Sequence, residues 1–315
     1  MPEIRPGVFR TPDRRFADLP EWPYEPAYLR LDDLPGTPGP VRVHVVDEGP
    51  PDAAETVLML HGEPSWSYLY RRMIPPVVAA GHRAVSFDFV GFGRSDKLTD
   101  VGAYSYELHR QTLLRVIEAL DLRRVTLVVQ DWGGLMGLPA AALDVPDRVA
   151  RLVVMNTFLP TGEETPSPAF RAWKASVGAL RTWLPVGALM RRALPRSQRY
   201  AVAAYTAPFP TRPSKAGAVA WPLLVPTEPG GPIGAHMAAA RAALARWDKP
   251  ALLVWSPEDP VLGGAASFFE RLIPTAGPAV EARGGHFLQD KSGAEIAAHV
   301  VRFVAETGDR TGPGS

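Results

Sequence analysis

The 315-residue chain contains no cysteine. Disulfide bonds, thiolate metal sites and cysteine nucleophiles are therefore excluded. The chain also lacks an excess of charge of either sign, because 34 Lys and Arg residues stand against 33 Asp and Glu residues, a formal net charge of +1. No overall field attracts nucleic acid or an anionic membrane surface, so neither is expected as a partner.

Long hydrophobic runs are missing too. No stretch reaches the roughly 18 uncharged apolar residues of a membrane span, and the first 16 residues have no apolar core of the signal-peptide type. We therefore expect a soluble, cytoplasmic protein. The sequence has no HExxH and no His, Asp and Glu grouping at metal-ligand spacing, so we expect neither a metal nor a cofactor.

Short apolar runs alternate with helix-like segments between residues 41 and 156. A hydrophobic content of 46% with 9% aromatic residues is that of a packed globule. Buried strands alternating with helices are typical of a mostly parallel sheet covered by helices on both faces. The first strand, with alternating polarity, is expected to be antiparallel. The predicted strands are Val41–Val46, Thr56–Leu60, Ala84–Phe89, Val125–Val129 and Leu152–Met155, and the predicted helices are Trp66–Ala79, Ser105–Leu120 and Gly134–Leu143.

The pattern changes after the fourth of the predicted parallel strands. Residues 157–228 contain no strand-like run, whereas strands return at Ala251–Trp255 and Ala279–Ala282, before a helix at Ala294–Glu306. A helical insertion at this point could cover the carboxyl ends of the strands, where open α/β sheets bind ligands. The sequence thus predicts a core in two parts (1–156 and 229–307), a helical cap (157–228) and a disordered tail (308–315). The proline-rich first 40 residues are expected to form an extended wrap with turns.

The strongest local signal is the segment Val-Val-Gln-Asp-Trp-Gly-Gly at residues 128–134. It places Asp131 on a tight turn between a predicted buried strand and a glycine-rich helix start, as in a nucleophile elbow. A carboxylate in this place can attack carbon and form an ester without a base to activate it. The alternative is an aspartate that only caps the helix.

Two further loops supply the other groups that such a nucleophile needs. The turn His61-Gly62-Glu63-Pro64 follows a predicted strand, so the backbone N–H groups of Glu63 and Trp132 can form an oxyanion hole. His286, in Gly-Gly-His-Phe after the last predicted strand, follows Asp131 in the chain order of hydrolases and is the candidate base.

An acid that orients the histidine is expected in the loop after strand Ala251–Trp255. Asp259 is the preferred residue and Glu258 the alternative. The other usual place is the end of strand Leu152–Met155, but Asn156 stands there. An amide cannot stabilise an imidazolium by charge, so the acid is expected from the later loop.

Several segments together resemble the haloalkane dehalogenases of the α/β-hydrolase superfamily, and among these the subgroup typified by the dichloroethane-degrading bacterial enzyme. The matching segments are HGEPSWSYLYR, GFGRSD, VVQDWGG, AYTAPFP and GGHF. The resemblance covers nearly the whole chain, with its weakest part at residues 174–200. It implies an α/β-hydrolase fold, a mostly parallel central sheet flanked by helices, with a helical cap inserted after the fourth parallel strand.

The resemblance also implies a role for each site residue. Asp131 would be the nucleophile, His286 the general base and Asp259 its partner. Trp132 and Trp173 would hold the leaving halide through their indole N–H groups. The substrate would be a small haloalkane, cleaved with water to alcohol, halide and a proton without metal or cofactor. Separately from the resemblance, the mixed surface gives no reason to expect more than a monomer. A small apolar pocket would be lined by Leu135, Phe170, Trp221, Pro222, Val225, Val261 and Leu262.

Other functions with the same residues remain open. An epoxide hydrolase shares the Asp-His-acid set, and Tyr200 and Tyr205 in the insertion could protonate an alkoxide. A haloacetate dehalogenase is disfavoured, because it would have an arginine where Trp132 stands. A non-catalytic binding protein on the same fold is disfavoured because all three catalytic positions are filled.

Overall fold

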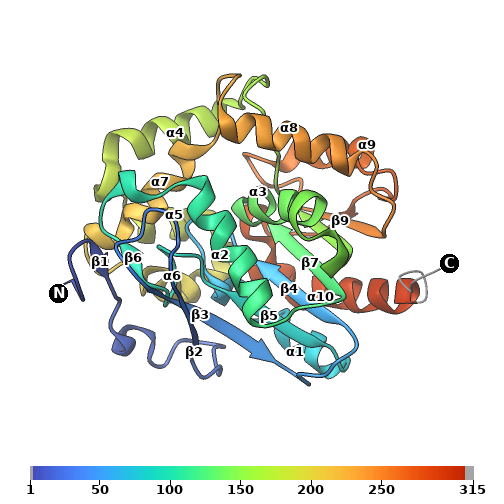
Figure 1. Ribbon diagram of the computed structural model, residues 1–315, viewed down its shortest axis with the longest axis horizontal. Helices are drawn as coiled ribbons and strands as arrows, with labels where there is room; N and C mark the ends of the chain where they lie inside the picture. The colour runs from blue at the N-terminus through green and yellow to red at the C-terminus, as the bar shows by residue number, and fades with distance from the viewer. Residues whose placement is uncertain (1–2, 309–315) are drawn as a thin grey trace.

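A single eight-stranded sheet forms the centre of the computed structural model, which describes residues 3–308 (Figure 1). Its strand order is β10-β9-β8-β7-β4-β5-β3-β2. In this order the six strands from β10 to β5 are all parallel to their neighbours among the six. Strand β3 is antiparallel to both of its neighbours, β5 and β2. The strands are β2 (Ala27–Leu31), β3 (Val41–Glu48), β4 (Thr56–Leu60), β5 (Arg83–Phe87), β7 (Val125–Gln130), β8 (Val149–Met155), β9 (Ala251–Trp255) and β10 (Val280–Glu281).

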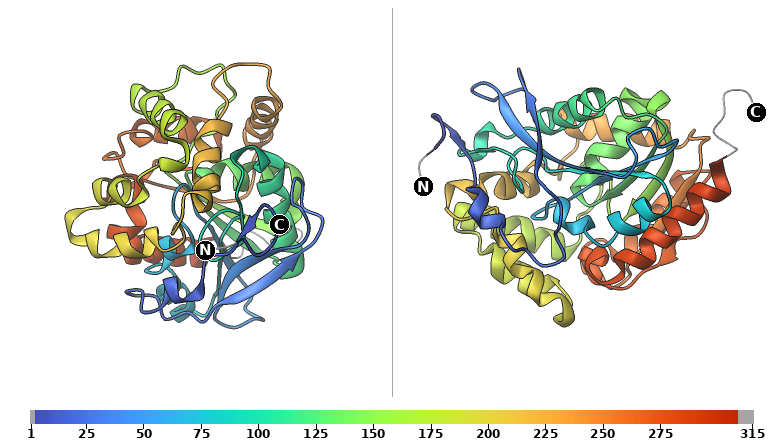
Figure 2. Two further views of the ribbon diagram at one scale, coloured as in Figure 1. Left: turned by 90° about the vertical axis from the view of Figure 1, so that its left-hand side faces the viewer. Right: turned by 90° about the horizontal axis from the view of Figure 1, so that it is seen from below.

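Helices cover both faces of this sheet (Figure 2). On one face α1 (Ile74–Ala79) packs against α10 (Leu288–Thr307), and on the other α3 (Trp132–Pro139) contacts α2 (Tyr106–Ala119) and α8 (Pro232–Leu244). Strands β4 and β7 are buried along their whole length, as unbroken apolar strands between two helical layers should be. The predicted mostly parallel, doubly covered sheet and its antiparallel first strand are confirmed.

Some element boundaries differ from the sequence prediction. The predicted helix Trp66–Ala79 is a 3₁₀ turn (Ser67–Tyr70) followed by α1, because Pro75 and Pro76 lack the N–H groups that a helix interior needs. Helix α10 begins at Leu288, six residues before the predicted start. The proline-rich start contributes strand β2, which was not predicted, and β1 (Val8–Phe9), which pairs with β6 (Lys97–Leu98) outside the main sheet.

The chain between β8 and α8 forms only helices and turns. It contains α4 (Pro168–Leu180), α5 (Val186–Ala193), α6 (Val202–Thr206) and α7 (Ala216–Leu224). Helix α5 contacts the turn Gly285–Phe287, which follows β10, so this segment lies over the carboxyl end of the sheet. The cap boundaries 157 and 228 stay a prediction, and all of the predicted disordered tail except Gly308 lies outside the described residues.

Within residues 3–308, no helix has both the length and the apolarity that a membrane crossing requires.

Candidate active site

Asp131 lies at the sharp turn between β7 and α3. Its backbone has φ 50° and ψ −124°, a conformation that costs free energy in any residue but glycine. The turn needs small neighbours: a Cβ on Gly62 would come within 2.3 Å of the Asp131 Oδ1, and one on Gly133 within 2.1 Å of the Leu60 carbonyl oxygen. The Asp131 side chain makes no capping hydrogen bond to α3, so the capping alternative does not describe it.

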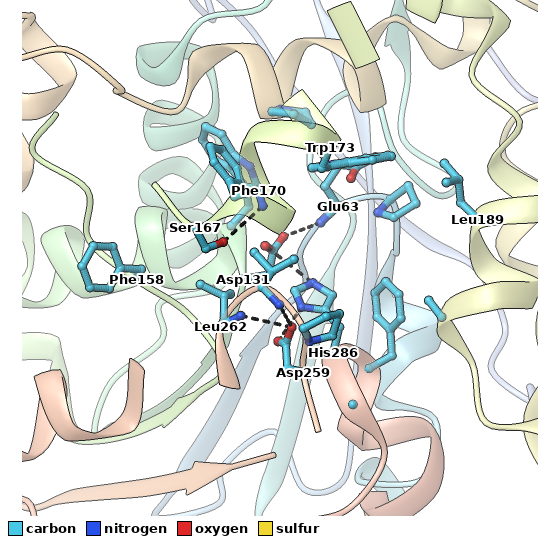
Figure 3. Close-up of a pocket in the computed structure, with 18 of the residues that line it drawn as sticks. Glu63, Asp131, Phe158, Ser167, Phe170, Trp173, Leu189, Asp259, Leu262 and His286 are labelled. Atoms are coloured by element: carbon cyan, nitrogen blue, oxygen red, sulfur yellow. Dashed lines mark hydrogen bonds and ion pairs between the residues drawn. The ribbon is translucent and has the colours of Figure 1, made fainter. Parts of the chain in front are cut away.

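The Asp131 carboxylate is held from two sides (Figure 3). The Glu63 N–H donates to Oδ1 at 2.8 Å, and the His286 Nε2 lies 3.7 Å from Oδ2. Burial raises the pKa of Asp131, while the charge of His286 and the backbone N–H groups of Glu63 and Trp132 oppose that rise. The same two N–H groups that were predicted to form the oxyanion hole therefore stabilise negative charge on this side chain.

His61 supports the loop that carries Glu63. Its Nε2 accepts a hydrogen bond from the Phe89 N–H at 3.1 Å, so its Nδ1 carries the proton and donates to the Gly62 carbonyl at 2.9 Å. Burial lowers the pKa of His61 to about 4, which keeps the ring neutral and this pair of hydrogen bonds intact at neutral pH.

His286 follows two glycines whose φ values of 128° and 66° allow the sharp turn after β10. Its Nδ1 lies 2.8 Å from the Asp259 Oδ2. Burial alone would lower the pKa of His286, but the charges of Asp259 and Asp131 outweigh it and raise the pKa to about 9. Gln130, which was not predicted, donates its side-chain amide to the His286 carbonyl at 3.1 Å and fixes the turn further.

Asp259, and not Glu258, contacts the histidine. The backbone N–H groups of Val261 and Leu262 donate to its Oδ1 at 2.8 and 3.1 Å. Burial would raise the pKa of Asp259, but the His286 charge and these hydrogen bonds lower it to about 2. The Glu258 carboxylate instead accepts from the Gly284 N–H at 3.1 Å.

Asn156 is a positioning residue that the sequence reasoning set aside. Its Nδ2 donates to the Asp259 Oδ2 at 3.0 Å, and its Oδ1 accepts from the Ser256 N–H at 2.8 Å. The amide at the end of β8 therefore orients the carboxylate at the end of β9. The order of neighbouring strands is what brings them together, and that order is not visible in the sequence.

A cavity of about 1400 Å³ opens above Asp131. This is far more than the small pocket expected. Ser167 and Phe158 lie on its walls with Leu189 on the opposite side in Figure 3. The predicted residues that line it are Glu63, Asp131, Trp132, Leu135, Phe170, Trp173, Pro222, Val225, Asp259, Val261, Leu262 and His286.

Trp221 was expected in this wall and is not part of it. It is fully buried, and its ring stacks on that of Trp132 with 5.0 Å between the ring centroids. Successive residues of a helix point about 100° apart, so Pro222 faces the cavity while Trp221 faces the core. Trp221 thus packs behind one of the predicted halide-binding residues.

The indole N–H groups of Trp132 and Trp173 have no acceptor among residues 3–308, although both side chains line the cavity. By contrast, the Trp66 and Trp255 indoles donate to the carbonyls of Ala204 and Leu262. Trp173 comes from α4 and Trp132 from α3, so a cap helix and a core helix each provide a free donor to the same cavity.

The two cap tyrosines point elsewhere. The Tyr205 hydroxyl is buried and donates to the Asp290 Oδ2 at 2.7 Å, and the Asp290 Oδ1 lies 2.7 Å from the Arg71 Nη1. The Tyr200 hydroxyl donates to Glu21 at 2.6 Å. Neither tyrosine lines the cavity, so neither is in place to protonate an alkoxide formed at Asp131.

The family model, the curated relatives and the solved structures that this chain resembles all indicate one family. Residues 55–292 match the model of the alpha/beta hydrolase fold. The chain is 43% identical to a haloalkane dehalogenase of Psychrobacter cryohalolentis, with 94% of this chain and 98% of that protein covered, and 45% identical to one of Mycolicibacterium paratuberculosis, with the same coverage. A haloalkane dehalogenase of Paraglaciecola agarilytica, whose structure is described as tetrameric, superimposes with a TM-score of 0.86 at 38% identity, covering 93% and 97% of the two chains. The chain therefore belongs to the haloalkane dehalogenase family of the α/β-hydrolase fold.

Proposed function

We propose that this protein cleaves the carbon–halogen bond of haloalkanes with water, yielding an alcohol, a halide ion and a proton, with Asp131 as nucleophile, His286 as base and Asp259 as its partner. One observation carries the assignment: the partly buried Asp131 carboxylate shares a cavity with two indole N–H groups that have no acceptor. The names of the relatives at 43–46% identity support the same activity.

In the first step, an Asp131 carboxylate oxygen attacks the halogen-bearing carbon. The carbon–halogen bond breaks and its electron pair leaves with the halide, while an alkyl ester forms on Asp131. The indoles of Trp132 and Trp173 stabilise the charge that develops on the halide, and a site shielded from water strengthens this interaction. Halide needs no proton to depart, so no general acid is required here.

In the second step, His286 takes a proton from water, which attacks the ester carbonyl carbon of Asp131. The N–H groups of Glu63 and Trp132 stabilise the oxyanion, and Asp259 stabilises the imidazolium. The bond from the carbonyl carbon to the alkyl oxygen then breaks, and the alkoxide takes the proton from the His286 imidazolium and leaves as the alcohol. The new Asp131 carboxyl group releases its proton to water and returns as the carboxylate. The Glu63 Oε1 has no hydrogen-bond partner. Burial, and to a lesser extent the charge of Asp131, raises the pKa of the Glu63 carboxyl. This favours the uncharged form of Glu63 beside the nucleophile.

The epoxide hydrolase alternative is not favoured. It requires acidic donors opposite Asp131, and the hydroxyls of Tyr200 and Tyr205 are bonded to Glu21 and Asp290 outside the cavity.

A monomeric state and a cytoplasmic location belong to this proposal as well. The Paraglaciecola agarilytica relative is described as tetrameric, so light scattering of the purified protein is the direct measurement. A mass near 34.1 kDa is expected, and a mass four times larger would contradict the monomer.

The decisive assay is halide release from 1,2-dibromoethane and 1-bromobutane, with consumption of styrene oxide followed in parallel. We expect bromide and alcohol in equal amounts over many turnovers, and no loss of the epoxide. Turnover of the epoxide without bromide release would contradict the proposal.

The pH dependence of the two steps should differ. His286 must be unprotonated to activate water, and its pKa of about 9 in the free enzyme depends partly on the Asp131 charge, which is lost in the ester. The pKa of His286 should therefore fall below 9 in the ester, and ester hydrolysis should slow about tenfold per pH unit below that pKa. Rapid-quench measurement of the first equivalent of bromide separates the steps: its rate should stay nearly constant from pH 9 to pH 6 while steady-state turnover falls. Parallel loss of both rates would contradict the assigned role of His286.

A further inference from the structure

The positive charge of this chain is concentrated in one segment. Residues 157–228 carry nine Lys and Arg residues against three Glu residues, a net charge of +6 in a chain whose total is +1. The remainder of the chain is therefore net acidic, at −5. This asymmetry does not appear in the overall composition, and the proposed chemistry of neutral haloalkanes gives it no use.

Three of these arginines, Arg191, Arg192 and Arg199, line the same cavity as Asp131. Arg191 and Arg192 end helix α5, and Arg199 lies in the following 3₁₀ segment Arg196–Ala201. All three are exposed, whereas Asp131 is only partly exposed. Their guanidinium groups make no hydrogen bond or ion pair within residues 3–308. The mouth of the cavity is thus lined by positive charges without partners.

The acidic groups that share the cavity do not neutralise these arginines. Glu164 pairs with Arg241 at 2.6 Å, and Glu258 accepts from the Gly284 N–H. Asp259 is bonded to His286. A backbone N–H leaves the negative charge of Glu258 in place, but three unpaired arginines outnumber this one exposed carboxylate. A cleft in which one sign of charge predominates raises the local concentration of oppositely charged ligands.

The cavity is also larger than a small haloalkane requires. Its volume of about 1400 Å³ exceeds the roughly 300–1,000 Å³ typical of small-molecule pockets. Leu189 and Met190, which precede the two arginines on α5, line it as well. One cavity therefore combines indole donors, apolar walls and exposed guanidinium groups.

From this combination of surfaces we infer that the protein accepts haloalkanoates, carboxylic acids whose halogen is on the carbon farthest from the carboxylate. The halogen would lie at Trp132 and Trp173, the methylene chain along the apolar walls, and the carboxylate at Arg191, Arg192 and Arg199. Guanidinium groups bind planar carboxylates through paired hydrogen bonds. The inference rests on the proposed function, and the reaction is the same displacement and ester hydrolysis, with an ω-hydroxycarboxylate, halide and a proton as products.

Acids with the halogen next to the carboxylate do not fit this arrangement. Their negative charge would lie beside the Asp131 carboxylate, which would repel it. The inferred specificity therefore depends on where the halogen is, and 2-bromohexanoate serves as an internal negative control.

The test compares pairs of substrates that differ only in charge: 6-bromohexanoate with 6-bromohexanamide, and 8-bromooctanoate with its amide. At low ionic strength we expect kcat/KM to be about tenfold higher for the carboxylate in at least one pair, with the ratio falling as salt is added. In the triple variant R191Q/R192Q/R199Q the ratio should fall to about one. Because each ratio is taken within one protein sample, a general loss of folding or activity cancels.

Matched controls remove the same charge away from the cavity. Arg181 and Arg196 are exposed arginines of the same segment that do not line it, and R181Q/R196Q should keep the wild-type ratio. The charge reversal R191E/R192E should bring the ratio below one. A wild-type ratio of one or less, or a ratio unaffected by the triple variant, would overturn the inference. Continued bromide release from 1-bromobutane would show that the proposed function survives such a result.

Discussion

The His286→Gln variant should release one equivalent of bromide from 1-bromobutane and then stop. Attack by Asp131 needs no base, so the ester forms, but without an imidazole no group takes the proton from water. We expect steady-state turnover to fall by about 10⁴-fold or more. Intact-protein mass spectrometry should show the alkyl adduct, and peptide analysis should place it on Asp131.

His299→Gln is the matched control for this variant. His299 lies on α10 with its Nδ1 near the Arg302 guanidinium at 2.9 Å, on an exposed part of the helix. It should retain wild-type turnover and accumulate no ester. Full turnover in His286→Gln, or a missing adduct despite a bromide burst, would show that another residue or another route hydrolyses the intermediate.

The Asp131→Asn variant should release no bromide at all, not even the first equivalent. An amide is a poor nucleophile toward carbon, so the first step is lost, a change expected to exceed about 10⁴-fold. Rapid-quench bromide measurement on freshly purified protein checks this result. The difference between a missing burst here and a complete burst in His286→Gln separates the nucleophile from the base.

Asp147→Asn provides the same chemical change at an exposed aspartate before β8, and it should leave turnover intact. Bromide release by Asp131→Asn at more than a trace would contradict the nucleophile assignment. If haloalkanes bound equally well to the wild-type protein and to Asp131→Asn, and neither protein turned them over, the binding-protein alternative would be favoured.

The central sheet was predictable because its strands are short unbroken apolar runs, such as Thr56–Leu60 and Val125–Gln130, each followed by a turn. Asp131 and His286 could be located because glycines mark the tight turns on which they stand. Strand β2 was missed, since Ala27–Leu31 has a single buried residue, Leu31, lies among prolines and shows little hydrophobic pattern. It is held by pairing with β3, a contact distant in the chain.

The rest of the site depends on side-chain directions that no local pattern encodes. Trp221 and Pro222 are adjacent in sequence, yet only the second lines the cavity. Asn156 could be read from the sequence only as a missing acid, whereas the neighbouring positions of β8 and β9 make it a hydrogen-bond donor to Asp259. The sequence likewise contains Arg191, Arg192 and Arg199, but it does not show that they line one cavity. That depends on how α5 and the segment Arg196–Ala201 pack.

The bonds among Tyr205, Asp290 and Arg71 bear on how this enzyme could be recombined with its relatives. Tyr205 belongs to α6, in the helical segment between β8 and α8. Asp290 belongs to the first turn of α10, four residues after His286. The helical segment and the core therefore share one buried polar contact. A chimaera that imported a foreign helical layer without a hydroxyl at this position would leave a buried carboxylate oxygen unpaired, at a cost of about 1–3 kcal/mol. Exchange of substrate-binding segments should therefore succeed only when donor and recipient agree at these three positions.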